Sequence, residues 1–187
     1  QQAEDCDLRP ATLRGQLRWW WRAMHAGHLG SDALRRLETA IWGDAQTGAA
    51  LSLAVRPVGR PAVRAYDTKD RYFQRAHDLE PPQKGAKTTQ GLFYASYGMD
   101  KISGENRPRW YAEPGSAWSV TLSARRAPAP GGVADLPAAI ILQQAEAALW
   151  LLARHGALGS KARKGFGAFA DLTIAGVAAH FPEERYG

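Results

Sequence analysis

The glycine-rich basic segment GALGSKARKGFGAF, at 156–169, carries residue types that suit contact with a phosphate. Glycines adopt left-handed backbone conformations and let the main chain approach a phosphate closely. Interleaved cations would neutralise the phosphate charge. The segment is not a Walker A motif, because it contains no GxxxxGK[ST]. It is not a dinucleotide fingerprint either, because it should lead into a strand rather than open a helix. The alternative is a tight helix-to-strand turn with incidental charge. The residues concerned are Gly156, Gly159, Lys161, Arg163, Lys164, Gly165 and Gly167.

A second stretch, LRPATLRGQLRWWWRAMHAG at 8–27, places three consecutive tryptophans among four arginines. On a helix, three of the arginines recur at a spacing of four residues, and one tryptophan points outward. Arginines beside an exposed tryptophan suit phosphate contact combined with base stacking. The alternatives are a solvated arginine face and a packing role for the tryptophan. The residues concerned are Arg14, Arg18, Arg22 and Trp19.

The same helix predicts different roles for the three tryptophans. At 100° per residue, Trp20 falls on the apolar face with Leu13, Leu17 and Met24. Trp21 lies at the border of that face and Trp19 points away from it. We therefore expect Trp20 in the core, Trp21 at its edge and Trp19 outside.

Other constellations of reactive residues give weaker signals. No HExxH motif occurs, and the neighbouring His25 and His28 have no accompanying set of cysteine or carboxylate ligands, so we expect no metal. No GxSxG nucleophile elbow occurs either. A histidine could act as the general base in metal-independent RNA cleavage, but nothing singles one out. We therefore expect no catalytic residue and no cofactor.

The composition of the 187 residues favours an acidic partner. The formal net charge is +6 and the sequence pI is about 9.7, which is typical of proteins that bind nucleic acid, although solubility alone is the alternative. The single cysteine, Cys6, and the lack of an apolar signal core suit a reducing cytosol, and we expect a cytoplasmic protein. The longest apolar stretch, 136–153, is interrupted by polar residues, so we expect no membrane association.

Two helices and a strand are predicted in the first third of the chain. The first helix should occupy 12–25 with Thr12 as its N-cap. The second, SDALRRLETAIWG, should be capped by Ser31 or Asp32 and end at Gly43. The alternating segment ALSLAVRPV predicts a strand that stops at Pro57.

The remaining elements surround a long irregular segment. Residues 59–116 show no sustained period, and we interpret them as a mobile, functional insertion with a short apolar element near 92–98. A second strand is predicted at 116–126, pairing antiparallel with a neighbour. A third helix should be capped by Asp135 and reach 154, and a last strand should cover about 166–174. This order predicts an α+β domain with helices on one face of a small antiparallel sheet.

Four segments together resemble a known family. LRPATLRGQLRWWWRAM, LRRLETAIWGD, RPRWYAEPGSAWSVTLS and LGSKARKGFGAF occur in this order and span 8–169. They resemble the motifs of the first RAMP subunits of the Cmr complex, the type III-B CRISPR RNA-guided effector. The tryptophan–arginine helix is specific to that family, whereas the glycine-rich loop is shared by the wider RAMP superfamily.

The resemblance implies a ferredoxin-like (RRM-like) βαββαβ domain that binds RNA within an antiviral ribonucleoprotein. The expected partners are the guide RNA near its 3′ end, the target RNA and other RAMP subunits, with target cleavage assigned to a different subunit. The residues expected to contact RNA are Arg14, Arg18, Trp19, Arg22, Gly159, Lys161, Arg163, Lys164, Gly165, Phe166 and Gly167. A RAMP-type endoribonuclease that processes guide RNA is one alternative, and a purely structural assembly subunit is another.

The chain departs from the family pattern in two places. Family members begin with a strand before the arginine helix, and they often carry a second ferredoxin-like domain. We therefore expect residues 1–187 to form a single RAMP domain that lacks the first strand at its N-terminus and contains the insertion at about 59–116.

Overall fold

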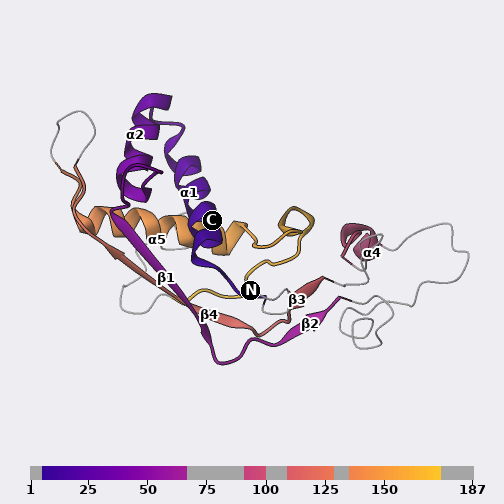
Figure 1. Cartoon of the computed structure of the whole chain (residues 1–187). Helices are drawn as coiled ribbons and strands as arrows, with labels where there is room; N and C mark the ends of the chain where they lie inside the picture. Colours follow the sequence, from indigo (N-terminus) through magenta and orange to yellow (C-terminus); the bar gives the residue numbers. More distant parts are fainter. Residues whose placement is uncertain (1–5, 67–90, 100–108, 129–134, 174–187) are drawn as a thin grey trace, which may run out of the picture.

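The computed structural model describes residues 6–66, 91–99, 109–128 and 135–173 (Figure 1). Its helices are α1 (Pro10–His25), α2 (Ser31–Trp42), the short α4 (Gly91–Ala95) and α5 (Ala138–His155). Its strands are β1 (Leu51–Val58), β2 (Val63–Ala65), β3 (Trp110–Ala112) and β4 (Ala117–Ala124), and a 3₁₀ turn, η2, covers Ala162–Lys164.

The strands form two antiparallel pairs that follow one another along a single ribbon. β1 pairs with β4 from Leu51 opposite Ala124 to Val58 opposite Ala117, and β2 pairs with β3. Figure 1 shows the ribbon running from beneath the long helices out to α4. β2 and β3 therefore give the segment around 59–116 regular structure on each side. The predicted mobile insertion covered all of 59–116, of which 67–90 and 100–108 lie outside the described residues.

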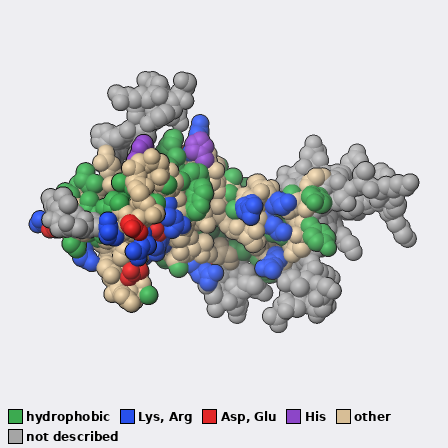
Figure 2. All heavy atoms as spheres, turned by 90° about the horizontal axis from the view of Figure 1, so that it is seen from above, with side chains coloured by type: hydrophobic (Ala, Val, Ile, Leu, Met, Phe, Trp, Pro, Cys, Tyr) green, Lys and Arg blue, Asp and Glu red, His purple; other side chains and the backbone are tan. Residues whose placement is uncertain are grey.

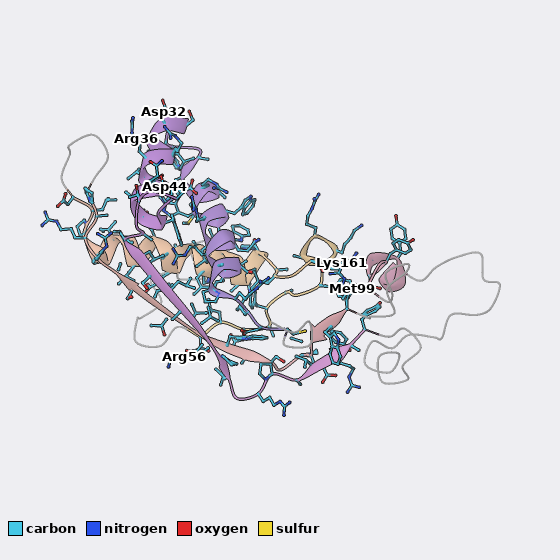
Figure 3. All side chains as sticks on the ribbon, viewed as in Figure 1. Asp32, Arg36, Asp44, Arg56, Met99 and Lys161 are labelled. Carbon is cyan, nitrogen blue, oxygen red and sulfur yellow. The ribbon has the colours of Figure 1, made fainter. Side chains whose placement is uncertain are left out.

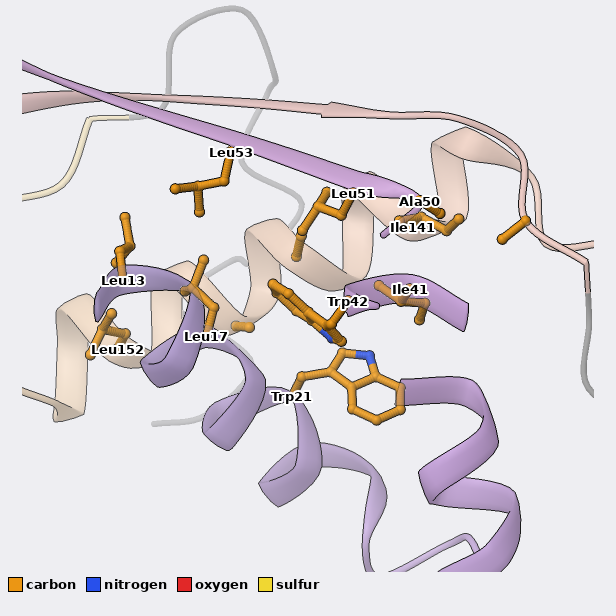
Figure 4. Close-up of a cluster of buried hydrophobic side chains, with 13 residues drawn as sticks. Leu13, Leu17, Trp21, Ile41, Trp42, Ala50, Leu51, Leu53, Ile141 and Leu152 are labelled. Carbon is orange, nitrogen blue, oxygen red and sulfur yellow. The ribbon is translucent and has the colours of Figure 1, made fainter. Parts of the chain in front are cut away.

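The long helices lie on one face of the β1–β4 pair. α1 contacts β1, α5 contacts β4, and α1 contacts both α2 and α5. The alternation of β1 turns Leu51 and Leu53 into the core, while Ser52 and Ala54 are exposed. Figure 4 shows side chains of α1, α2, β1 and α5 meeting in this layer. The predicted α+β class, with helices over one face of a small antiparallel sheet, is confirmed. Setting α2 apart, the order α1, β1, β4, α5 matches the middle of a βαββαβ pattern.

The predicted roles of two tryptophans are reversed in the structure. Trp21 is the core residue, with 1% of its surface exposed, and Trp20 is only half-buried against the edge of the core. The indole N–H of Trp21 donates a hydrogen bond to the Gln144 side chain on α5, at 2.7 Å. The helical wheel considered one apolar face, but α2 covers a second flank of α1 and buries Trp21 between three helices. Trp19 is 52% exposed, as predicted.

The predicted helix caps are wrong at three helix starts. α1 begins at Pro10 after Arg9, and α2 begins at Ser31 after Gly30, with no side-chain cap at either start. Asp135 does not cap α5; its carboxylate pairs with Arg126 at 2.6 Å. In α1, proline fixes a helical φ in the first turn and so replaces the predicted threonine cap.

One predicted strand boundary and one predicted strand also differ from the structure. β1 continues one residue past Pro57. Residues 166–173 form no strand, because the main chain here folds back on the loop before it, with Ala157 bridged to Ala168. A strand requires a partner edge, and this backbone is paired locally instead.

Candidate nucleic-acid interface

The segment after α5 forms a closed loop. The Leu158 N–H donates to the Gly167 carbonyl at 3.0 Å, which joins the two ends of the loop. The 3₁₀ turn η2 lies between them, where the Lys164 N–H donates to the Lys161 carbonyl at 2.8 Å. Leu158 packs against the hydrophobic core. The loop is therefore held at its base, and its tip projects from the end of α5.

Three glycines give this loop its shape. Gly159, Gly165 and Gly167 have φ values of 107°, 86° and 74°, a region that residues with a Cβ atom rarely adopt. A Cβ atom at Gly167 would lie 1.9 Å from the carbonyl oxygen of Leu158. The prediction that glycines here adopt left-handed conformations is confirmed for these three, whereas Gly156 is extended, with a φ of −107°. Gly167 is also required for the close approach that closes the loop.

The loop cations face the short helix α4 and solvent. The Lys161 ammonium donates to the Tyr97 carbonyl at 2.6 Å, and the Lys164 ammonium lies 5.6 Å from the centre of the Tyr94 ring. Arg163 is exposed and Phe166 is half-buried. Figure 2 shows Lys and Arg side chains gathered over the loop, with hydrophobic side chains over α4 beside them. Figure 3 shows Lys161 on the side of the loop that faces α4. The loop thus presents positive charge next to exposed aromatic rings.

The arginine stripe on α1 is mostly engaged with α2. The Arg18 Nε and an Arg22 guanidinium nitrogen both donate to Glu38 Oε1, at 2.7 and 2.8 Å. Arg18 also donates to the carbonyl of Gly43, at 3.3 Å. Glu38 is buried, so its carboxylate requires these cations as partners. Two of the three α1 arginines predicted to contact RNA therefore hold α1 against α2, and only their remaining donors face solvent.

Arg14 and Trp19 lie away from this ion pair. Within the described residues, Arg14 is half-buried and makes no hydrogen bond or ion pair. Trp19 packs edge-on against Trp20, with ring centroids 4.8 Å apart, and the Trp20 ring lies 6.5 Å from that of His155. His155 is the last residue of α5, directly before the loop. The structure therefore links Trp19 to the start of the loop rather than to the arginine stripe.

The aromatic residues of α4 were not predicted as part of the site. The sequence indicated only a short apolar element near 92–98, and α4 confirms that element. Its contacts with the loop join residues 64 and 70 positions apart, which no local pattern reveals. The two tyrosines in LFYASYG were the only available signal in the sequence.

The environment of His25 on α1 lowers its pKa. Its Nε2 atom is buried and has no hydrogen-bond partner among the described residues, and its ring lies 4.6 Å from that of Trp21. Burial, with a smaller contribution from the charge of nearby His28, lowers the pKa of His25 below its ordinary value of 6.5. The folded protein therefore favours neutral His25.

We expect acidification to destabilise the fold through His25. Because its pKa is lower in the folded chain, the unfolded chain binds the proton more readily below pH 6.5, so the free energy of unfolding falls as the pH decreases from 7 towards 5. The contribution of one histidine is at most about 1.4 kcal/mol per pH unit. Denaturant titrations at several pH values should show a flatter dependence for His25→Leu, whereas His28→Gln should retain most of the slope. An unchanged slope in His25→Leu would contradict this assignment.

The described part of the chain contains no group of three or more histidine, cysteine, aspartate or glutamate side chains placed to hold a metal ion. None of the helices within the described ranges is long and apolar enough to cross a membrane.

Comparison with known proteins places these features in a family context. The sequence profile described as "RAMPs: RAMP superfamily" matches residues 3–170. The "CRISPR system Cmr subunit Cmr1-1" of Pyrococcus furiosus is 21% identical over 164 residues, which cover 86% of this chain and 39% of that protein.

A solved structure shares the fold. It is described as "Crystal structure of Cmr1 from Pyrococcus furiosus (apo form)" and superposes with a TM-score of 0.55 at 19% identity. The match covers 83% of this chain and 39% of that one. The chain thus spans about two fifths of the length of both relatives, and at this level of identity the likeness shows the fold alone.

Proposed function

Because the chain belongs to the RAMP superfamily, we propose that it acts as a non-catalytic, RNA-binding subunit of a type III-B CRISPR effector complex. In this role it contacts guide and target RNA near the 3′ end of the guide and assembles with other RAMP subunits. The similarity to a Cmr subunit over 86% of the chain supports this role.

The observation that carries the proposal is the geometry of the closed loop at 156–169. Three left-handed glycines expose the main chain, and Arg163 and Lys164 stand exposed on the 3₁₀ turn. Main-chain N–H groups and cations of this kind position a phosphate without reading a sequence. No Asp or Glu occurs within 156–169, so nothing in the loop repels a polyanion.

The ion pairs on α1 refine which arginines should contact RNA. Arg14 makes no hydrogen bond or ion pair within the described residues, whereas Arg18 and Arg22 share the Glu38 carboxylate. One carboxylate between two guanidinium groups leaves a net positive charge on this flank. We infer that Arg14, with Arg163 and Lys164 in the loop, supplies most of the phosphate contact, and that Arg18 and Arg22 add a weaker attraction.

Binding of single-stranded RNA at several salt concentrations tests this proposal. We expect the intact chain to bind with a steep salt dependence, and Arg163→Ala to reduce the slope of log K against log salt by about 0.7, the value for one phosphate contact on a single strand. Arg14→Ala should have a similar effect. Fluorescence anisotropy with a labelled oligonucleotide measures both. The matched control is Arg36→Ala, because Arg36 is exposed on α2, away from the loop (Figure 3).

The outcome of the titration separates this role from its alternatives. An RNA affinity that did not depend on salt and was unchanged by both substitutions would contradict the proposal. A purely structural subunit would bind no RNA at all. RNA recovered after metal-free incubation should be intact. Cleavage abolished by a single histidine substitution would instead identify an endoribonuclease.

A further inference from the structure

The short helix α4 is held in place from the side of the β2–β3 pair. The Tyr66 hydroxyl, at the end of β2, donates to the buried Ser96 hydroxyl just after α4. The Arg109 N–H, at the start of β3, donates to the Met99 carbonyl at 3.1 Å, and Met99 is buried. The turn that follows α4 is therefore anchored on the β-ribbon.

The glycine-rich loop also contacts α4 and the turn that follows it. The Lys161 ammonium donates to the Tyr97 carbonyl at 2.6 Å, and the Lys164 ammonium lies 5.6 Å from the Tyr94 ring centre. These contacts bring together three parts of the chain that are distant in sequence: the end of β2, α4 and the loop. α4 thus has a defined position beside the cations of the loop (Figure 3).

Two tyrosines of this turn project into solvent despite the anchoring around them. Tyr94 is 71% exposed and Tyr97 is 83% exposed, the two highest values among the exposed large hydrophobic residues of the described chain. They are three residues apart, and the Tyr97 N–H donates to the Tyr94 carbonyl at 3.2 Å, so both side chains leave the same tight turn. Neither ring contributes to the core, and both present a flat aromatic surface.

Charge decides which occupant suits these rings. Neither 91–99 nor 156–169 contains an Asp or a Glu, whereas the loop contributes Lys161, Arg163 and Lys164. A flat aromatic surface next to several cations matches single-stranded nucleic acid, because bases stack on the rings while phosphates meet the charges. A protein segment would offer no matching negative charge unless it were strongly acidic.

We propose that Tyr94 and Tyr97 form a stacking platform for unpaired RNA bases, with Arg163 and Lys164 bound to the phosphates beside those bases. This inference rests on the proposed RNA-binding function and extends it to α4, a part of the chain outside the arginine helix and the glycine-rich loop. Stacking of this kind tolerates any base, so the platform holds the strand without selecting a sequence.

The test compares a 12-nucleotide uridine RNA with an abasic oligomer of the same length and backbone. In the intact chain, Tyr94→Ala combined with Tyr97→Ala should weaken binding to the uridine RNA by about 5- to 150-fold for each base that loses its stacking. Binding to the abasic oligomer should not change, because its phosphates still meet the cations. Tyr94→Phe with Tyr97→Phe should retain the affinity, since a phenyl ring also stacks.

Two controls keep the outcomes distinct. Ile140→Ala removes an exposed apolar side chain from α5 and should leave both affinities unchanged. Far-UV circular dichroism checks that the tyrosine variants are folded. Full affinity of the double alanine variant for the uridine RNA overturns the stacking platform. Equal losses of affinity for the two oligomers also overturn it. If the unmodified chain binds neither oligomer, the proposed function itself fails.

Discussion

Replacing Trp21 with alanine should lower the free energy of unfolding by about 3–5 kcal/mol, whereas Trp19→Ala should cost less than about 1 kcal/mol. Trp21 is 1% exposed and lies where α1, α2 and α5 meet (Figure 4). Its removal leaves a large cavity and takes away the N–H that Gln144 accepts at 2.7 Å. Trp20→Ala should fall between the two, because Trp20 is half-buried at the edge of the core.

Denaturant unfolding followed by far-UV circular dichroism measures this series. Circular dichroism is preferable to fluorescence because each variant removes an emitting indole. Trp21→Phe is the matched control: it keeps most of the ring volume, leaves the Gln144 oxygen without its donor, and should cost about 1–3 kcal/mol. If Trp20→Ala were as costly as Trp21→Ala, the helical-wheel assignment of Trp20 to the core would be correct and the packing described above would be wrong.

The main elements of the fold follow from local patterns. Alternation located β1 and β4, and apolar residues at helical spacing located α1 and α2, because one face of each element packs towards the core. The third helix was predicted from flanking residues, and its predicted cap at Asp135 is wrong. The antiparallel pairing expected of the 116–126 strand is confirmed by the register of β1 with β4. The RAMP resemblance, drawn from four motifs, is confirmed by the profile that matches residues 3–170.

Features that depend on contacts distant in sequence were not predictable. The wheel of α1 shows one apolar face, but the position of α2 decides that Trp21 is buried more deeply than Trp20. The same contact places Glu38 between Arg18 and Arg22, which lie 20 and 16 residues away. The arginine spacing therefore indicated a cationic stripe correctly but could not reveal that a buried carboxylate engages two of its members.

The backbone of the glycine-rich loop was predictable from the sequence, but its contact with α4 was not. Glycines interleaved with cations indicated a loop with left-handed residues, because glycine adopts a positive φ without a steric penalty. The contact of Lys161 and Lys164 with α4 depends on the β-ribbon that carries α4 towards the loop. The RNA contacts assigned to Arg14, Trp19 and the loop stay predictions that the binding experiments test.

The glycine-rich loop provides the second large expected effect, through Gly167→Ala. A Cβ atom at this position would lie 1.9 Å from the Leu158 carbonyl oxygen, so the Leu158 N–H could not keep its 3.0 Å hydrogen bond to the Gly167 carbonyl. A left-handed alanine raises the free energy of the folded loop by about 1–2 kcal/mol. The clash raises it by about 1–3 kcal/mol more. We expect the loop to open at its base and RNA affinity to fall by more than about tenfold, because binding must then restore the closed conformation.

Gly165→Ala is the matched control for this prediction. Gly165 also has a positive φ, of 86°, but a Cβ atom there would meet nothing within 4 Å. It shares the strain of the left-handed conformation and lacks the clash, so its effect on affinity should be smaller than that of Gly167→Ala. Hydrogen exchange at the Leu158 amide reports loop closure directly: protection should be lost in Gly167→Ala and kept in Gly165→Ala. If the two variants lost affinity equally while Leu158 stayed protected in both, loop closure would not be what the RNA requires, and the glycines would act only through their backbone freedom.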